Sequence, residues 1–283
     1  MTTTAPAPTT GRAAGPLRRF VTDRPVLTTS ALLVASSWTA HAVALAAGLP
    51  TMVGIAMSLP FFLVVPLAVS AVLGGRAEAG RLLRRVAQWR FGAGWWLLVL
   101  VALPVVTTLV AVATGTYHAP DGGWTAELFT YVVLGLLFFG VVGNLAEEMA
   151  WGGFVQSRLM DRHGLVVGSL LTAIPFALFH LPLAFDGQDL TAIRWGDVAF
   201  GYGLTVAISP FMRYVLGATM LGTGGSVLAI GMMHASFNAS GGLSMVDGWW
   251  QYMAALVIVS GALAGYRYVV ARRPGHAVTP ATA

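Results

Sequence analysis

The sequence predicts an all-α membrane protein, a bundle of about eight transmembrane helices, and three observations predict it. Hydrophobic residues make up 57% of the chain and charged residues only 10%, whereas an ordinary soluble domain carries about 25% charged residues. The mean hydropathy is +0.75. Several windows also reach the roughly 20 apolar residues that a spanning segment needs. Because every backbone polar group must pair inside a bilayer, these segments are expected to be helices.

Eight apolar windows justify this helix count. They fall approximately at residues 26–48, 51–74, 92–114, 127–157, 164–185, 197–217, 223–242 and 249–271. No internal repeat or second domain separates them, so we expect one transmembrane domain over residues 26–272. The fourth window is longer than a perpendicular span requires at about 1.5 Å per residue. We therefore expect this helix to tilt or to protrude from the membrane.

The segments outside the windows are expected to be tails or surface structure. Residues 1–25 are rich in Thr, Ala and Pro and predict a disordered cytoplasmic tail. Residues 273–283 predict a C-terminal tail. Residues 75–91 alternate arginines with apolar side chains, a pattern typical of an interfacial helix on the cytoplasmic face.

The arginines predict the topology. All 16 basic residues are arginine, and all except Arg194 fall on the inner side of the membrane if the N-terminus is cytoplasmic. This asymmetry matches the positive-inside rule and predicts that both termini are cytoplasmic. We therefore expect a multi-pass protein of the cell membrane. Topology also accounts for the pI of about 10.1, so the basic charge does not predict a nucleic-acid partner.

Polar side chains within the windows are the candidate functional residues, because ionisable groups inside a membrane are costly and usually functional. Cysteine is absent, which excludes disulfides, thiolate metal sites and a cysteine nucleophile. The candidates are Glu147, Glu148, His180, His234 and Asn238. His41 is alone in its window, and we expect it to be structural and hydrogen-bonded to a neighbouring helix.

Helical spacing predicts how these candidates face. His234 and Asn238 are four residues apart and share one face of a helix, so both can point into the same cavity. Phe176 and His180 have the same spacing, and we expect the phenyl ring to pack beneath the imidazole. Glu147 and its neighbour are about 100° apart around the helix axis, so only one of the two carboxylates can face a central cavity.

If these groups meet, two chemistries are open. Glu147, His180 and His234 resemble the two-histidine, one-glutamate set that holds a catalytic zinc ion. Alternatively, Glu147 with His180 activates water as a general base, while His234 and Asn238 donate hydrogen bonds to the oxyanion of a tetrahedral intermediate. The carboxamide favours the second chemistry, because an amide is a poor zinc ligand and a good donor.

The chain resembles the CPBP intramembrane proteases, also called the CAAX protease and bacteriocin-processing or Abi family. The family signature is Glu-Glu-x-x-x-Arg, then Phe-x-x-x-His, then His-x-x-x-Asn, on separate membrane helices. The counterparts here are Glu147 with Glu148, Phe176 with His180, and His234 with Asn238. The resemblance extends over residues 127–242, which we take as the motif-bearing core, and implies an intramembrane metalloprotease or glutamate-type protease.

One position departs from the family pattern. The family arginine stands four residues after the second glutamate, where this chain has Gly152. Glu148 thereby loses its expected partner, and a buried carboxylate needs a cation or a proton. Arg213 interrupts an otherwise apolar window, so we expect it to compensate.

We therefore expect an endopeptidase that cleaves a membrane-associated peptide or protein. Glu147 is the predicted general base or zinc ligand, Glu148 its support, His180 its partner, and His234 with Asn238 the oxyanion or metal-binding pair. A noncatalytic immunity or scaffold protein that retains the fold is the alternative, for which Gly152 is the best argument. A proton or solute transporter is a third class, because Glu and His relays also serve transport.

Overall fold

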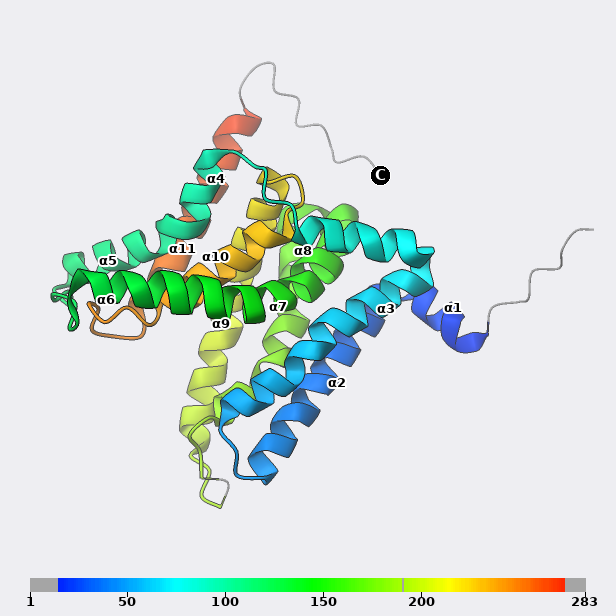
Figure 1. Ribbon diagram of the computed structural model, residues 1–283, viewed down its shortest axis with the longest axis horizontal. Helices are drawn as coiled ribbons and strands as arrows, with labels where there is room; N and C mark the ends of the chain where they lie inside the picture. Colours follow the sequence, from blue (N-terminus) through cyan, green and yellow to red (C-terminus); the bar gives the residue numbers. More distant parts are fainter. Residues whose placement is uncertain (1–14, 190, 273–283) are drawn as a thin grey trace, which may run out of the picture.

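The computed structural model describes residues 15–189 and 191–272, and the elements within these ranges are helices with one isolated antiparallel bridge between Tyr117 and Val246. Figure 1 shows their arrangement. In chain order the helices are α1(Pro16–Asp23), α2(Pro25–Ala46), α3(Thr51–Val86), α4(Ala93–Leu97), η1(Leu98–Ala102), α5(Leu103–Thr114), α6(Gly123–Phe129), η2(Thr130–Asn144), α7(Leu145–Ala150), η3(Trp151–Gln156), α8(Ser157–Phe179), η4(Leu181–Phe185), α9(Trp195–Gly222), α10(Val227–Ser240) and α11(Gln251–Ala271).

The predicted class, a helical membrane bundle, is confirmed, and each of the eight apolar windows coincides with helix. Among the described residues, six helices are long and apolar enough to cross a membrane. The fourth and fifth windows share one of them, Gly123–Phe179, which bends at Gly164, where φ is +75°. The seventh window is α10, which has only 14 residues. The number of spans and the orientation of the termini stay predictions.

The prediction of a disordered N-terminal tail is wrong for its last part, because Pro16–Asp23 form helix α1. Proline suits the first position of a helix, since its φ is already helical and it has no N–H to leave unpaired. Val21 packs against a buried cluster of α2 and α3 and so holds this helix on the bundle. Residues 1–14 and 273–283, with the rest of both predicted tails, lie outside the described residues.

The predicted surface helix is the last part of α3, after a break at Gly74 and Gly75. Gly75 has φ +63°, a left-handed conformation that glycine adopts without steric penalty. In Figure 1 the cyan stretch after this break runs in a different direction from the blue stretch before it. The helix continues only to Val86, so the last residues of the predicted segment lie outside it.

Contacts from this segment bring the arginine-rich regions of the chain together. Arg85 donates to the carbonyl oxygens of Gly153 and Gly225, each at 2.8 Å. Arg158 donates to Glu78 at 2.8 Å. Regions that the positive-inside rule assigns to the same membrane face are therefore neighbours in space, as the predicted topology requires.

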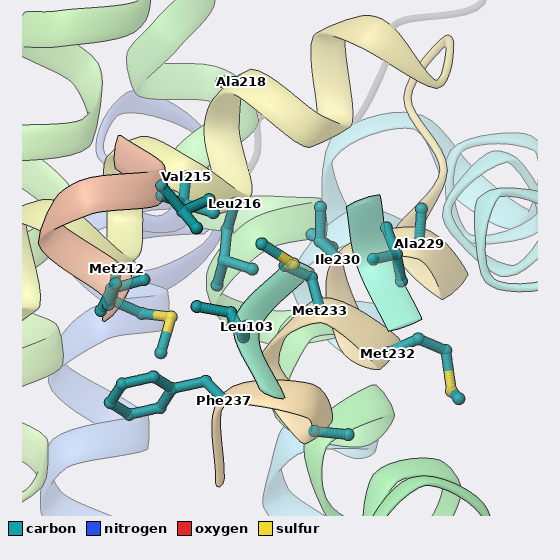
Figure 2. Packing of buried hydrophobic residues seen from close by; sticks show 14 of the residues in the cluster. Leu103, Met212, Val215, Leu216, Ala218, Ala229, Ile230, Met232, Met233 and Phe237 are labelled. Atoms are coloured by element: carbon teal, nitrogen blue, oxygen red, sulfur yellow. The ribbon is translucent and has the colours of Figure 1, made fainter. Parts of the chain in front are cut away.

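Two buried apolar clusters form the core of the bundle. The first joins α5, α9 and α10, and Figure 2 shows Leu103, Met212, Leu216, Ile230 and Met233 packed within it. The second joins α2, α3, α7, η3 and the end of α8. Polar residues on α7, α8 and α10 lie where these clusters meet, so their neighbours are fixed by apolar packing on both sides.

Candidate active site

The two adjacent glutamates lie on α7, a short α-helical stretch between the π-helices η2 and η3. π-helical turns are rare in proteins, and those that occur are often found at functional sites. Glu148 is completely buried, whereas the side chain of Glu147 is 13% exposed and lines a cavity. The prediction that only one carboxylate faces the cavity is therefore confirmed.

Glu148 contacts an arginine and a histidine within the bundle. Its Oε1 accepts a hydrogen bond from Arg213 Nη2 at 2.6 Å and lies 2.8 Å from Nδ1 of His234. The expectation that Arg213 pairs with Glu148 is confirmed, although this arginine lies inside α9 and not in a cytoplasmic segment. Glu148, the predicted support of Glu147, also contacts the histidine of α10.

Several groups fix Arg213 in this position. Its backbone carbonyl accepts from Gln156 Nε2 at 2.5 Å and from Ser169 Oγ at 3.2 Å. Its guanidinium carbon lies 4.4 Å from the ring centroid of Phe176, within the range of a cation–π interaction. The main chain of Arg213 is therefore held by Gln156 and Ser169, and its charged end by Glu148 and an aromatic face.

The structure explains why an arginine is absent at position 152. A Cβ atom on Gly152 would lie 2.2 Å from Cδ1 of Ile230 and 2.7 Å from Oε2 of Glu148. Ile230 is fully buried and belongs to the cluster of Figure 2, so a side chain at position 152 would require this packed neighbour to shift. The cation is supplied from α9, and α10 fills the space beside Gly152.

His180 faces the other carboxylate. Its Nε2 lies 3.7 Å from Oε1 of Glu147, and its Nδ1 lies 2.8 Å from the carbonyl oxygen of Phe176. A carbonyl oxygen only accepts, so Nδ1 carries the hydrogen and Nε2 of the neutral ring presents a lone pair to the glutamate. The Phe176 and imidazole ring centroids are 4.4 Å apart, which confirms the expected packing of the phenyl ring against the histidine.

A cavity of about 480 Å³ brings together side chains from five parts of the chain. Glu147, His180, His234 and Asn238 all line it, so the predicted residues share one cavity. Asn238 is exposed to it, and no hydrogen bond fixes its carboxamide within the described residues.

Further polar residues line the same cavity, among them Asn144 and His41, and the sequence analysis assigned neither of these two to the site. Asn144 precedes Glu147 by three residues, and this helical spacing could have indicated a shared face. His41 comes from α2, far away in the chain. The expectation that it bonds to a neighbouring helix is wrong, because its Nδ1 contacts the carbonyl oxygen of Ser37 in its own helix at 2.9 Å.

A second cavity of about 440 Å³ lies between α9, α10 and α11, and it is lined largely by apolar and aromatic side chains. It also reaches His180, His234 and Asn238. These three residues are thus shared by the two cavities, whereas Glu147 lines only the first one.

The expected zinc ligands do not converge on one point. Among residues 15–189 and 191–272, no three His, Cys, Asp or Glu side chains are grouped as a metal ion would require. Nδ1 of His234 is occupied by Glu148, and the other two ligands face each other across 3.7 Å. We therefore derive no step through a metal ion.

Comparison with known proteins identifies the segment that carries this site. Residues 129–240, about two fifths of the chain, match the family model described as type II CAAX prenyl endopeptidase Rce1-like. The matched segment contains Glu147, Glu148, His180, His234 and Asn238, and it excludes His41. No curated protein matches the chain.

Proposed function

We propose that the protein hydrolyses a peptide bond of a membrane-associated protein with water activated by Glu147, starting from the match of residues 129–240 to the Rce1-like family model of CAAX prenyl endopeptidases. The observation that carries the proposal is the pair formed by Glu147 and His180, because a carboxylate oxygen and an imidazole nitrogen lie 3.7 Å apart and both residues line one cavity. A protein with a prenylated C-terminal CAAX sequence is the substrate class that the family description suggests.

The distance between the two groups fits a bridging water. Oε1 of Glu147 is buried and has no hydrogen-bond partner among the described residues, and 3.7 Å to His180 Nε2 is too long for a direct bond. Polar groups at such a separation are commonly joined by water. A water placed here donates one hydrogen to each group and directs an oxygen lone pair at the substrate carbonyl carbon.

Proton transfers then balance the reaction. Glu147 takes a proton from the water as the C–O bond forms, and the tetrahedral intermediate carries the negative charge on the former carbonyl oxygen. The protonated glutamate gives this proton to the amide nitrogen as the C–N bond breaks. The products are a carboxylic acid, which ionises, and an amine.

His234 and Asn238 lie one turn apart on α10 and are the proposed donors to the oxyanion. For the histidine this requires a hydrogen on both ring nitrogens. Two buried carboxylates need two positive charges nearby. Arg213 supplies one of them to Glu148, and the imidazole of His234 lies 2.8 Å from the same carboxylate.

The two cavities suggest how a peptide binds. Both reach His180, His234 and Asn238, so an extended chain that crosses these residues places the segments before and after its scissile bond in different cavities. The second cavity contains Phe200, Trp249 and Tyr252, which suit a large apolar group. Membrane-associated substrates with apolar side chains fit such a surface.

Cleavage of a fluorescent prenylated CAAX peptide by protein reconstituted in lipid nanodiscs tests the proposal, with the same peptide without its prenyl group as comparison. We expect cleavage that Glu147→Gln abolishes and that a zinc chelator leaves unchanged. Loss of activity with the chelator, and its return with zinc, would favour the metal-dependent alternative. Binding without cleavage would favour the noncatalytic immunity or scaffold protein.

A further inference from the structure

His41 is a buried titratable residue that the proposed reaction does not use. It lies on α2, outside the segment that matches the protease family, and it is only 4% exposed. It nevertheless lines the 480 Å³ cavity together with Glu147, His180 and Asn238. A polar side chain in this position faces the same contents of the cavity as the reactive groups.

The imidazole of His41 is held in one orientation. Its Nδ1 lies 2.9 Å from the carbonyl oxygen of Ser37, one turn earlier in α2. Its Cδ2 edge packs against Gly54 of α3, where an added Cβ would lie only 2.9 Å from Cδ2. These contacts hold the ring at Nδ1 and along its Cδ2 edge, whereas Nε2 makes no hydrogen bond among the described residues.

The helix that carries His41 is itself joined to the site. Trp38 donates from Nε1 to the carbonyl oxygen of Leu178 at 3.0 Å, near the end of α8 and two residues before His180. This bond sets the position of α2 relative to the reacting groups. A hydrogen-bonding group on α2 is therefore held near the segment that carries His180.

The free nitrogen of His41 is an acceptor. A carbonyl oxygen cannot donate, so Nδ1 carries the hydrogen in the bond to Ser37, and Nε2 of the neutral ring has a lone pair. Nε2 is buried and has no partner among the described residues. Buried polar groups without partners are rare and unfavourable, which points to a ligand that supplies the missing donor.

We propose that His41 binds substrate, with Nε2 accepting a hydrogen bond from a main-chain N–H of the peptide beside the scissile bond. This inference rests on the proposed function. A peptide that enters an apolar cavity loses water from each of its N–H groups, and each then needs an acceptor. Ser58 lines the same cavity, but its hydroxyl already donates to the carbonyl oxygen of Gly54 at 2.8 Å, whereas Nε2 of His41 makes no hydrogen bond among the described residues.

Backbone-ester scanning tests this contact. Each main-chain N–H of the peptide, except that of the scissile bond, is replaced in turn by an ester oxygen, and kcat and KM are measured for the wild type and for His41→Phe. We expect one ester to reduce kcat/KM of the wild type about tenfold. His41→Phe should show the same loss with the all-amide peptide and no further loss with that ester.

Two additional variants separate binding from folding. His41→Gln keeps an acceptor near the position of Nε2 and should recover part of the lost kcat/KM. His118→Phe removes a histidine from the loop between α5 and α6, far along the chain from this cavity, and should leave the kinetics unchanged. Thermal unfolding of all variants identifies any that fail to fold.

The inference is overturned if His41→Phe cleaves with the KM and kcat of the wild type, or if the same ester lowers kcat/KM tenfold in both proteins. Failure of the proposed function gives a different result. A protein that binds the peptide without cleaving it contradicts the proteolytic proposal, and the affinity of the fluorescent peptide for Glu147→Gln with and without His41→Phe then decides the role of His41. Equal affinities, or no binding at all, reject it.

Discussion

Glu147 and Glu148 are neighbours in the chain, yet their surroundings differ in almost every respect. Glu148 is fully buried against Arg213 and His234, and its contacts are between 2.6 and 2.8 Å. Glu147 lines a cavity, and its side chain lies 3.7 Å from that of His180. Two identical neighbouring residues can therefore have different roles: one fixes the site, and the other remains free to react.

The largest effect is expected from removing the charge of each glutamate in turn. Glu147→Gln should lower kcat by about 10²–10⁴-fold, the usual contribution of a general base, with little change in thermal stability. Glu148→Gln should lower both stability and activity, because Arg213 then keeps a buried charge without a counter-ion. Activity assays and thermal unfolding in detergent measure both effects, and equal behaviour of the two variants would contradict the division of roles.

Breaking the Glu148–Arg213 pair is expected to have the next largest effect. Arg213→Leu should destabilise the protein by about 3–5 kcal/mol, since it leaves a buried carboxylate uncompensated. Adding Glu148→Gln to it should restore much of this stability, because neither charge then remains. A double variant that is as unstable as the sum of the two single variants would show that the pair is not coupled.

Moving the positive charge from position 213 to position 152 tests whether packing excludes a side chain there. Gly152→Arg in the Arg213→Leu background should not restore stability, because Ile230 occupies the space beside Gly152. Adding Ile230→Ala removes the clash and should recover part of the stability and activity. Recovery of stability without the change at Ile230 would show that α10 can shift to accommodate a side chain at position 152.

A smaller effect is expected from Phe176, which contacts both sides of the site. Its ring lies 4.4 Å from the guanidinium carbon of Arg213 and 4.4 Å from the imidazole centroid of His180. Phe176→Leu keeps most of the apolar volume and removes the aromatic face, so we expect a loss of about 1–2 kcal/mol in unfolding free energy. An unchanged midpoint of chemical denaturation would rule out a significant cation–π contribution.

Much of the fold follows from local patterns in the sequence. Apolar windows of the correct length give helices because the backbone must satisfy its own hydrogen bonds in a bilayer. Helical spacing likewise predicted that His234 and Asn238 share a face and that Phe176 packs against His180, and the structure has both. Composition was misleading for α1, because apolar contacts with α2 and α3 decide its structure.

The sequence by itself determined the helices, the spacing within each motif and the need for a cation near Glu148, because these depend on residues close in the chain and on the cost of charge in an apolar medium. Only the tertiary structure decided that Ile230 excludes a side chain at Gly152, that Glu148 binds His234, and that His41 lies in the same cavity as Glu147. Those facts depend on how distant helices pack, and no periodicity along a single helix contains that information.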